Sequence, residues 1–437
     1  MVGLGASVAE HFAPVLSGLI GSGSRVGLRF WDGSVLSPAQ PAATLVLASP
    51  LAVRYLLWAP GELGVARAYV SGELEVEGDV YAALSVGEAL ARHGRDGTVK
   101  APGRLTMLGL ARRLGAIGPP PARPAEEARL SGRRHSPARD AAAIAYHYDI
   151  SNEFYRLVLG PTMTYSCAYF SEERLTLEEA QAAKYDLICR KLGLGPGSRL
   201  LDVGCGWGGM VLHAAEHYGA YAVGVTISAR QAELAKERVA AAGLEERVEI
   251  RLQDYRDISD GPYDAISSIG MFEHVGLAKL REYFNVLRAL LRDGGRLLNH
   301  AISRPSGSAS AFRTRSFIDR YVFPDGELLE VGTVISALQE CGLEARDVEC
   351  LREHYERTLR AWVANLEARL DEAISLVGEG RTRVWRLYMA ASAMNFAANR
   401  MSVHQVLAVR TAPGGASGMP PTRADLLGEP ALSRASG

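Results

Sequence analysis

The sequence predicts a doubly wound α/β domain that follows a smaller N-terminal domain of mixed α/β structure. Apolar runs of strand length alternate with amphipathic stretches of helix length between residues 141 and 410. The stretch 116–140, rich in proline and arginine, has the composition of a linker, and it sets residues 1–115 apart. Residues 411–437, rich in glycine, proline and small residues, are expected to form a disordered tail.

Each element of the α/β region follows from its apolar pattern. The expected strands cover 199–204, 221–226, 247–252, 263–269 and 295–302. The expected helices cover 175–192, 208–218, 229–242 and 277–292. Amphipathic stretches at 359–370 and 384–396 predict a late pair of helices, and residues 404–410 predict a closing strand. In the first domain, short apolar runs at 43–48 and 51–58 indicate two further elements.

Composition excludes several classes of protein. The net charge of −1 lacks the basic excess of a nucleic-acid-binding protein, so no nucleic-acid partner is expected. The five cysteines form no CxxC pair and no metal-ligand spacing, which indicates reduced thiols, no metal site and a cytoplasmic protein. We identify no signal peptide and no apolar stretch of about 18 residues that would span a membrane.

The most informative motif is Leu-Leu-Asp-Val-Gly-Cys-Gly-Trp-Gly-Gly at 200–209, an apolar strand that enters a glycine-rich turn before a helix. Glycines permit positive φ and let a ligand approach the main chain closely. Dinucleotide enzymes use a related turn, but the Gly-x-Gly-x-x-Gly fingerprint with its following acid is missing here. The pattern therefore favours a site for S-adenosylmethionine (SAM) over a nicotinamide site.

Further motifs then identify a family. They are Tyr146-His-Tyr-Asp149, Thr164-Tyr-Ser-Cys-Ala-Tyr-Phe170, Leu201 to Gly209, Val223-Gly-Val-Thr-Ile-Ser228, Gln253-Asp-Tyr-Arg-Asp257 and Gly270-Met-Phe-Glu-His-Val-Gly276. Over about residues 140–410 the chain resembles the cyclopropane-fatty-acyl-phospholipid synthases, a group that includes the mycolic acid methyltransferases. Residues 66–79 resemble, more loosely, the first domain of the phospholipid-acting members. They are most similar to the actinobacterial enzymes that methylenate oleoyl chains in the 10-methylstearate pathway.

The resemblance implies a SAM-dependent methyltransferase with a Rossmann-like domain. Its members add a methylene carbon to the cis double bond of an unsaturated phospholipid acyl chain, which yields a cyclopropane or a 10-methylene product. An alkene is a weak nucleophile, so positioning of the sulfonium methyl group supplies much of the acceleration. The resulting carbocation must lose a proton in a channel that excludes water. In the family, the base is a bound bicarbonate ion.

The resemblance assigns five residues to that anion: Cys167, Glu273, His300, Ile302 and Tyr355. A backbone amide, a phenol and an imidazole can all donate to bicarbonate. The glutamate would hold the imidazole tautomer or accept the hydrogen of the bicarbonate hydroxyl. Without the resemblance, the cysteine is most simply a small buried apolar side chain, and the histidine and tyrosine are packing residues.

A second set of residues is expected to hold SAM. The turn glycines would line its methionine portion, tyrosine and serine of the Tyr-Ser-Cys motif would close over its amino-acid end, and an aromatic ring would stack on adenine. At the end of the second strand, where related enzymes carry an acid for the ribose, this chain has threonine, with glutamine five residues later. The expected SAM-binding residues are Tyr146, Tyr165, Ser166, Asp202, Gly204, Gly206, Gly208, Thr226, Gln231, Gln253, Asp254 and Tyr255.

The implied partners are a phospholipid membrane surface, a second copy of the chain in a homodimer, and a reductase that acts on a methylene product. The protein would bind reversibly to the inner face of the plasma membrane, docking through the first domain with residues 51–58 and Arg67. Candidate walls of an acyl channel are Phe317, Tyr321, Phe323, Trp362 and Met394. Two alternatives remain: methyl transfer to a heteroatom of a small soluble acceptor, and a lipid-binding protein without catalysis.

Overall fold

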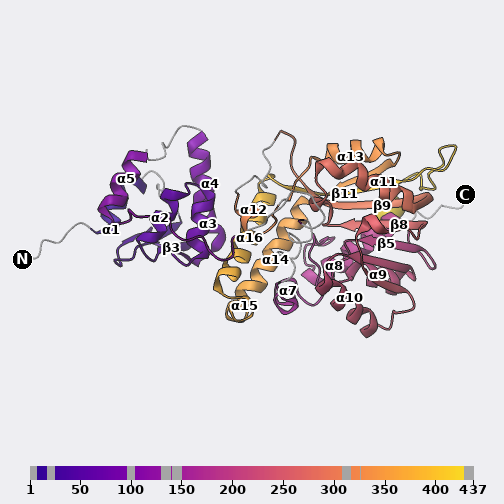
Figure 1. The fold of residues 1–437 in the computed structure, drawn as a ribbon, viewed down its shortest axis with the longest axis horizontal. Helices are drawn as coiled ribbons and strands as arrows, with labels where there is room; N and C mark the ends of the chain where they lie inside the picture. The colour runs from indigo at the N-terminus through magenta and orange to yellow at the C-terminus, as the bar shows by residue number, and fades with distance from the viewer. Residues whose placement is uncertain are drawn as a thin grey trace, which may run out of the picture. The chain divides into compact units, whose positions relative to one another are not determined.

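The computed structural model describes residues 7–16, 25–95, 104–128, 139, 150–307, 316–324 and 326–427. The chain divides into two compact units (Figure 1). Unit 1 comprises Met1–Ala128, Thr314–Val322 and Val377–Ala391, and unit 2 comprises Arg129–Arg313, Phe323–Leu376 and Ser392–Gly437. Part of the expected linker, residues 116–128, therefore belongs to unit 1, where Ala116 is fully buried in a hydrophobic cluster.

Unit 2 is built on a seven-stranded sheet in the order β10-β11-β9-β8-β5-β6-β7. Its strands are β5 (Arg199–Val203), β6 (Tyr221–Thr226), β7 (Val248–Leu252), β8 (Tyr263–Ile269), β9 (Leu291–Ser303), β10 (Glu344–Cys350) and β11 (Ser402–Val409). The five strands from β9 to β7 in this order are parallel, and β11 runs antiparallel to both of its neighbours. The predicted doubly wound α/β fold is confirmed.

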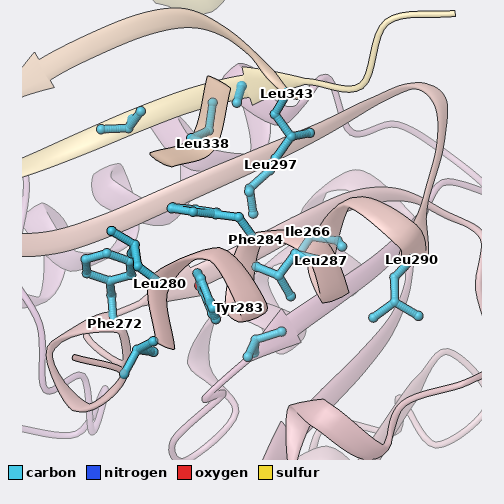
Figure 2. Close-up of a cluster of buried hydrophobic side chains, with 14 of the residues drawn as sticks. Ile266, Phe272, Leu280, Tyr283, Phe284, Leu287, Leu290, Leu297, Leu338 and Leu343 are labelled. Carbon is cyan, nitrogen blue, oxygen red and sulfur yellow. The ribbon is translucent and has the colours of Figure 1, made fainter. Parts of the chain in front are cut away.

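Helices cover both faces of this sheet. The helices of unit 2 are α7 (Asn152–Leu159), α8 (Leu177–Leu192), α9 (Gly209–Tyr218), α10 (Ala229–Ala241), α11 (Leu280–Leu290), α13 (Val331–Glu340), α14 (Arg352–Ala368), α15 (Leu370–Val377) and α17 (Ala424–Leu427). Most of α16 (Glu379–Ala397) belongs to unit 1. In Figure 1, α11 and α13 lie on one face of the sheet, and α8, α9 and α10 lie on the other. Figure 2 shows the first core, where Phe284 and Leu287 of α11 pack against Ile266 and Leu297 of the sheet.

Burial explains where the helices form. The capping box of Thr176 and Glu179 starts α8, and Gly193, in the left-handed region with φ +68°, ends it. Helix α11 buries Leu280, Tyr283, Phe284, Leu287 and Leu290 at the spacing of one helical face. The second core, under α8, α9 and α10, is built mainly from small and aliphatic side chains.

Several elements differ from the sequence prediction. Strand β9 begins at Leu291, four residues earlier than expected, since the helix before it ends at Leu290. Strand β10 was not expected, because this edge strand buries only Asp347 among its seven residues and has no apolar alternation. The expected tail is wrong for residues 411–427: Leu426 of α17 is buried in the second core, and Met419 packs against it.

Unit 1 is the mixed α/β domain that the sequence predicts. Its four-stranded sheet has the order β2-β1-β3-β4, with β1 parallel to β3 and the other two pairs antiparallel. The strands are β1 (Val26–Arg29), β2 (Val35–Leu36), β3 (Ala43–Leu47) and β4 (Leu74–Gly78). The helices are α1 (Val8–Leu16), α2 (Pro50–Trp58), α3 (Glu62–Val70), α4 (Val80–Arg95), α5 (Arg104–Arg113) and α12 (Phe317–Tyr321).

A buried ion pair ties α12 into unit 1. The guanidinium of Arg67 donates two hydrogen bonds of 2.8 Å to Glu127, whose carboxylate also accepts from the Tyr321 hydroxyl at 3.4 Å. The carboxylate of Glu62 accepts from the backbone N–H of Phe317 at 3.0 Å. Arg67 is thus engaged in an ion pair with the buried Glu127, and its role in membrane docking stays a prediction.

Candidate active site

A cavity opens at the carboxyl ends of β5, β6 and β8, where doubly wound folds place their ligands. Ten of the twelve expected SAM-binding residues line it: Tyr165, Ser166, Asp202, Gly204, Gly206, Thr226, Gln231, Gln253, Asp254 and Tyr255. Tyr146 lies outside the described residues. Gly208 does not line the cavity. It precedes α9 in the left-handed region, where an added Cβ would lie 3.3 Å from that of Ala235, so its role is helix packing.

The turn after β5 shows why glycine is required. Gly204 has φ +78°, and an added Cβ would lie 2.7 Å from the Cβ of Met271, which is too close for any side chain. Gly206 also has a positive φ of +54°, but an added Cβ would meet no atom of the described chain within 4 Å. Because Gly206 lines the cavity, that space is available to a ligand lying on the main chain. The turn therefore fits SAM.

The next two strands supply polar and aromatic groups to the cavity. The Thr226 hydroxyl donates to Gln231 Oε1 at 2.9 Å and accepts from the N–H of Ser228 at 3.2 Å, which fixes the glutamine amide. Asp254 accepts from the Arg256 guanidinium through both carboxylate oxygens, at 2.9 and 2.6 Å. The Tyr255 ring packs edge-on against Tyr283, with centroids 5.5 Å apart. These polar groups can hydrogen-bond the ribose and adenine of SAM, and the tyrosine ring can stack on the adenine.

Helix α8 holds the Tyr-Ser-Cys loop over the cavity. Gln181 Nε2 donates to the carbonyl of Ser166 at 2.9 Å, and Lys184 Nζ donates to the Ser166 hydroxyl at 3.1 Å. Lys184 is fully buried, and this burial lowers its pKa to about 7. The sequence analysis missed Lys184. Its position three residues after Gln181, on the apolar face of α8, is the signal that could have found it.

Asp202 lies at the end of β5, behind the turn. Its carboxylate is fully buried and accepts from the Ser267 hydroxyl at 2.6 Å. Burial raises its pKa to about 6, while the hydrogen bond and the charge of Lys184 act in the opposite direction. Asp202 therefore orders the end of β5 as expected, with a lysine on α8 as an additional electrostatic partner.

A second polar site lies at the ends of β8 and β9. Glu273 follows β8 in a short 3-10 helix, and its Oε1 accepts from the N–H of Ile302 at 2.7 Å. His300 and Ile302 are two residues apart on β9, so their side chains point to the same face of the sheet. The backbone amide that was expected to donate to an anion thus donates to Glu273 instead. Burial raises the pKa of Glu273 to about 7 and lowers that of His300 to about 3.

Cys167 and Tyr355 both bind the backbone carbonyl of Leu351. The carbonyl of Leu351 accepts from the Cys167 thiol at 3.6 Å and from the Tyr355 N–H at 3.1 Å. The N–H of Leu351 donates to the Val403 carbonyl at 2.9 Å, and Val403 stands opposite Ile302 in the β9–β11 ladder. Hydrogen bonds thus join Cys167 to Tyr355 through Leu351 and join Ile302 to Glu273, and the ladder register places Val403 beside Ile302.

Two buried side-chain atoms of Glu273 and His300 lack a hydrogen-bond partner within the described part of the chain: Glu273 Oε2 and His300 Nε2. An unpaired buried polar atom costs about 1–3 kcal/mol. A small ligand that both accepts and donates hydrogen bonds would satisfy such a pair. Bicarbonate has a hydroxyl hydrogen for a carboxylate and oxygens for an imidazole N–H, so the donor set fits it.

The parallel sheet, the glycine turn and the lined cavity define the class of the protein: it is a SAM-dependent methyltransferase. Comparison with known proteins then identifies the family. Residues 135–406 match the family described as mycolic acid cyclopropane synthetase, and the chain belongs to it. This confirms the family resemblance that the motifs indicate.

Similar proteins cover most of the chain. It is 44% identical over 401 residues to a probable fatty acid methyltransferase of Mycobacterium tuberculosis, covering 89% of this chain and 92% of the relative. It is 39% identical over 289 residues to the tuberculostearic acid methyltransferase UfaA1 of the same organism, covering 64% and 67%. A solved mycolic acid cyclopropane synthase complexed with SAH and CTAB is 37% identical, with a TM-score of 0.59, covering 61% of this chain and 97% of that one.

Proposed function

We propose that this methyltransferase adds a methylene carbon from SAM to the cis double bond of an unsaturated fatty acyl chain in a phospholipid. The observation that carries the proposal is the buried pair of polar atoms, Glu273 Oε2 and His300 Nε2. Transfer to a heteroatom and lipid carriage need no base enclosed beside the cofactor cavity. The relatives named as fatty acid and tuberculostearic acid methyltransferases support an acyl substrate.

Bound SAM supplies an electrophilic methyl group. The residues around the cavity then have distinct tasks. The turn at Gly204 and Gly206 holds the main chain open to the methionine portion, and the loop at Tyr165 and Ser166, anchored by α8, closes over its other end. The positions of turn and loop set the line of approach of the double bond, on which the rate of attack by a weak nucleophile depends.

Deprotonation of the substrate carbocation falls to the second polar site. As the methyl carbon bonds to one alkene carbon and leaves sulfur, the other alkene carbon becomes positive, and a C–H proton must leave to form the product. Bicarbonate would supply the base. Glu273, held by the Ile302 amide, would accept the hydrogen of its hydroxyl, and His300 would donate to one of its oxygens. Burial of both residues excludes water that would quench the cation.

The product class depends on which proton leaves. Loss from the new methyl group closes a cyclopropane, whereas loss after a hydride shift along the chain gives a 10-methylene group. We favour the 10-methylene product, because the N-terminal sequence resembles the methylenating enzymes and a tuberculostearic acid methyltransferase is among the relatives. Proton NMR of purified lipid distinguishes a vinylidene pair from upfield ring-methylene signals, and ring signals would overturn this choice.

Mass spectrometry of lipids from cells that express the chain tests the proposed function. We expect C18:1 acyl chains to gain one carbon and two hydrogens. The matched control is the Glu273→Gln variant, which keeps the cofactor cavity and should leave the acyl chains unmodified. Unchanged lipids in cells that express a folded, SAM-binding protein would refute the proposal.

We also propose that unit 1 binds the membrane surface, with a dimer presenting this surface twice. Trp58 and Ile117 are 56% and 52% exposed, and the Trp58 indole N–H donates to the carbonyl of Gly118 beside Ile117. Arg112 and Arg113 end α5 nearby in the chain, and both are exposed. Apolar side chains next to basic ones suit an anionic bilayer. Among the described residues, no helix is long and apolar enough to cross a membrane.

Sedimentation with anionic phospholipid vesicles tests this surface. The double variant Trp58→Ser, Ile117→Ser should bind about tenfold more weakly, because two large apolar contacts with the bilayer are lost. The matched control is Leu376→Ser, which removes an exposed apolar side chain from unit 2. Binding of the unsubstituted chain should also weaken as salt is added. Equal binding by the double variant and the control would exclude this surface.

A further inference from the structure

The orientation of the Gln405 side chain determines the tautomer of His300. Gln405 is fully buried on β11, directly opposite His300 of β9. Its Oε1 accepts from Lys191 Nζ at 2.8 Å, and its Nε2 lies 3.3 Å from His300 Nδ1. An ammonium group can only donate, so the amide atom that faces Lys191 must be the oxygen. The amide NH2 therefore faces His300 and donates to Nδ1.

The consequence is a neutral imidazole whose single proton lies on Nε2. His300 is fully buried, and burial lowers its pKa to about 3, to which the charges of Lys184 and Lys191 contribute. A neutral imidazole that accepts at Nδ1 carries its hydrogen on Nε2. This Nε2 is the buried atom without a partner in the described chain, so it presents an unused donor to the second polar site.

Lys191 is itself fixed in place by acidic residues. Its ammonium is buried with 1% of the side chain exposed, and it contacts carboxylates of Asp347 at 3.4 Å and of Glu349. Asp347 is also paired at 2.6 Å with Arg423, in the segment between β11 and α17. The ammonium therefore has a fixed direction toward Gln405, and the amide cannot turn over without losing a charged partner.

We propose that Lys191 and Gln405 are positioning residues that hold the His300 proton on Nε2, where it donates to the anionic base. This inference rests on the proposed function, because it takes bicarbonate as the ligand that receives the hydrogen bond. Neither residue touches the reacting atoms; both act through the imidazole. A purely structural role, in which Lys191 joins α8 to β10 and β11, would affect stability but not the tautomer.

Nitrogen NMR of the histidine-labelled full-length protein tests the tautomer directly. The signals of His300 are assigned by their loss in a His300→Asn variant. We expect a protonated Nε2 and an unprotonated Nδ1 in the unsubstituted protein, and a mixture of tautomers in Gln405→Met. A protonated Nδ1 in the unsubstituted protein would overturn the proposal without any need for the Gln405 variant to fold.

Bicarbonate affinity supplies the second readout. In buffer freed of carbon dioxide, the bicarbonate concentration that restores half of the turnover should rise in Gln405→Met in proportion to the loss of the Nε2-protonated tautomer, about twofold for an equal mixture. Lys191→Arg should restore most of the affinity that Lys191→Met loses, and Gln339→Met, at an exposed glutamine of α13, is the matched control. Unchanged tautomer and affinity in Gln405→Met would refute the positioning role. Turnover independent of bicarbonate in the unsubstituted enzyme would instead refute the proposed base, and the NMR result would still decide the tautomer.

Discussion

The cofactor cavity and the buried polar site are built in different ways. The floor of the cavity is a single strand–turn–helix segment, where glycine backbone conformations at Gly204 and Gly206 create space, and other segments add its polar and aromatic groups. The polar site draws on side chains and amides of β9, β11, α14 and two loops that lie far apart in the sequence. The glycine turn of the cavity is a local property of the main chain, whereas the polar site exists only when distant segments meet.

Because the two regions are built separately, we expect that substitutions can impair catalysis and cofactor binding independently. A substitution in the polar site should remove chemistry and leave cofactor binding, while a substitution in the turn should do the reverse. Lys184 is the exception. It donates to Ser166 at the cavity, and its charge also acts on Asp202 and on His300 of the polar site.

The largest effect is expected for Glu273→Gln. The amide has no negative charge with which to accept the bicarbonate hydroxyl hydrogen, so kcat should fall on the order of a thousandfold or more, the range for loss of a positioned proton-transfer group. SAM affinity, measured by calorimetry, should stay unchanged, because the glycine turn is intact. Glu237→Gln, on the exposed face of α10, is the control. Near-normal turnover in Glu273→Gln would show that the two regions are not divided as proposed.

The opposite pattern is expected for the turn. Gly204→Ala places a Cβ against Met271 at a φ of +78°, so both thermal stability and SAM affinity should fall, the latter roughly tenfold to a hundredfold. Gly206→Ala has no clash with the chain, but it is strained at a φ of +54°, so it should weaken SAM binding with a smaller loss of stability than Gly204→Ala. Calorimetry and thermal unfolding on both variants check this. Equal stability losses would show that Gly206 serves the fold and not the ligand.

The pH dependence of turnover should identify the carboxylate. Burial raises the pKa of Glu273 to about 7, so below this pH the group is protonated and no longer accepts the bicarbonate hydroxyl hydrogen. At saturating bicarbonate, kcat should fall by up to about tenfold for each pH unit below that value. His300, with its pKa lowered to about 3, stays neutral throughout this range. A flat profile between about one unit below and one unit above pH 7 would contradict the assignment.

The smallest effect is expected for Lys184→Met, which tests the link between the regions. Loss of the hydrogen bond to Ser166 loosens the loop over the cavity, while burial of the new side chain is favourable, so SAM affinity should fall only several-fold. Because the lysine charge disfavours protonation of His300, the pKa of that histidine should rise. Histidine NMR and calorimetry measure both. An unchanged pKa of His300 would contradict the electrostatic link between the two regions through Lys184.

How far the sequence predicts each region follows from the same contrast. The strand–turn–helix pattern gives β5, the glycine turn and α9 within a residue or two, because local spacing determines them. Residues such as Gln405 and Lys191 follow from no local motif, since their importance comes from pairing β11 against β9 and from α8 packing beneath the sheet. The resemblance names His300 but does not indicate what orients it. Likewise, the polar strand β10 cannot be predicted from its own residues, because it forms by pairing with β11.

Unit 1 has a consequence for the order of folding, because it is not continuous in sequence. The Phe317 amide that binds Glu62 is 255 residues away in the chain, and the guanidinium groups of Arg383 and Arg386 reach Glu75 and Tyr69 across 308 and 317 residues. A ribosome adding about 5–20 residues per second would need roughly ten to fifty seconds between residue 128 and residue 391. Residues 1–128 of unit 1 are thus synthesised first, but unit 1 cannot complete its fold until residues 377–391 have been synthesised.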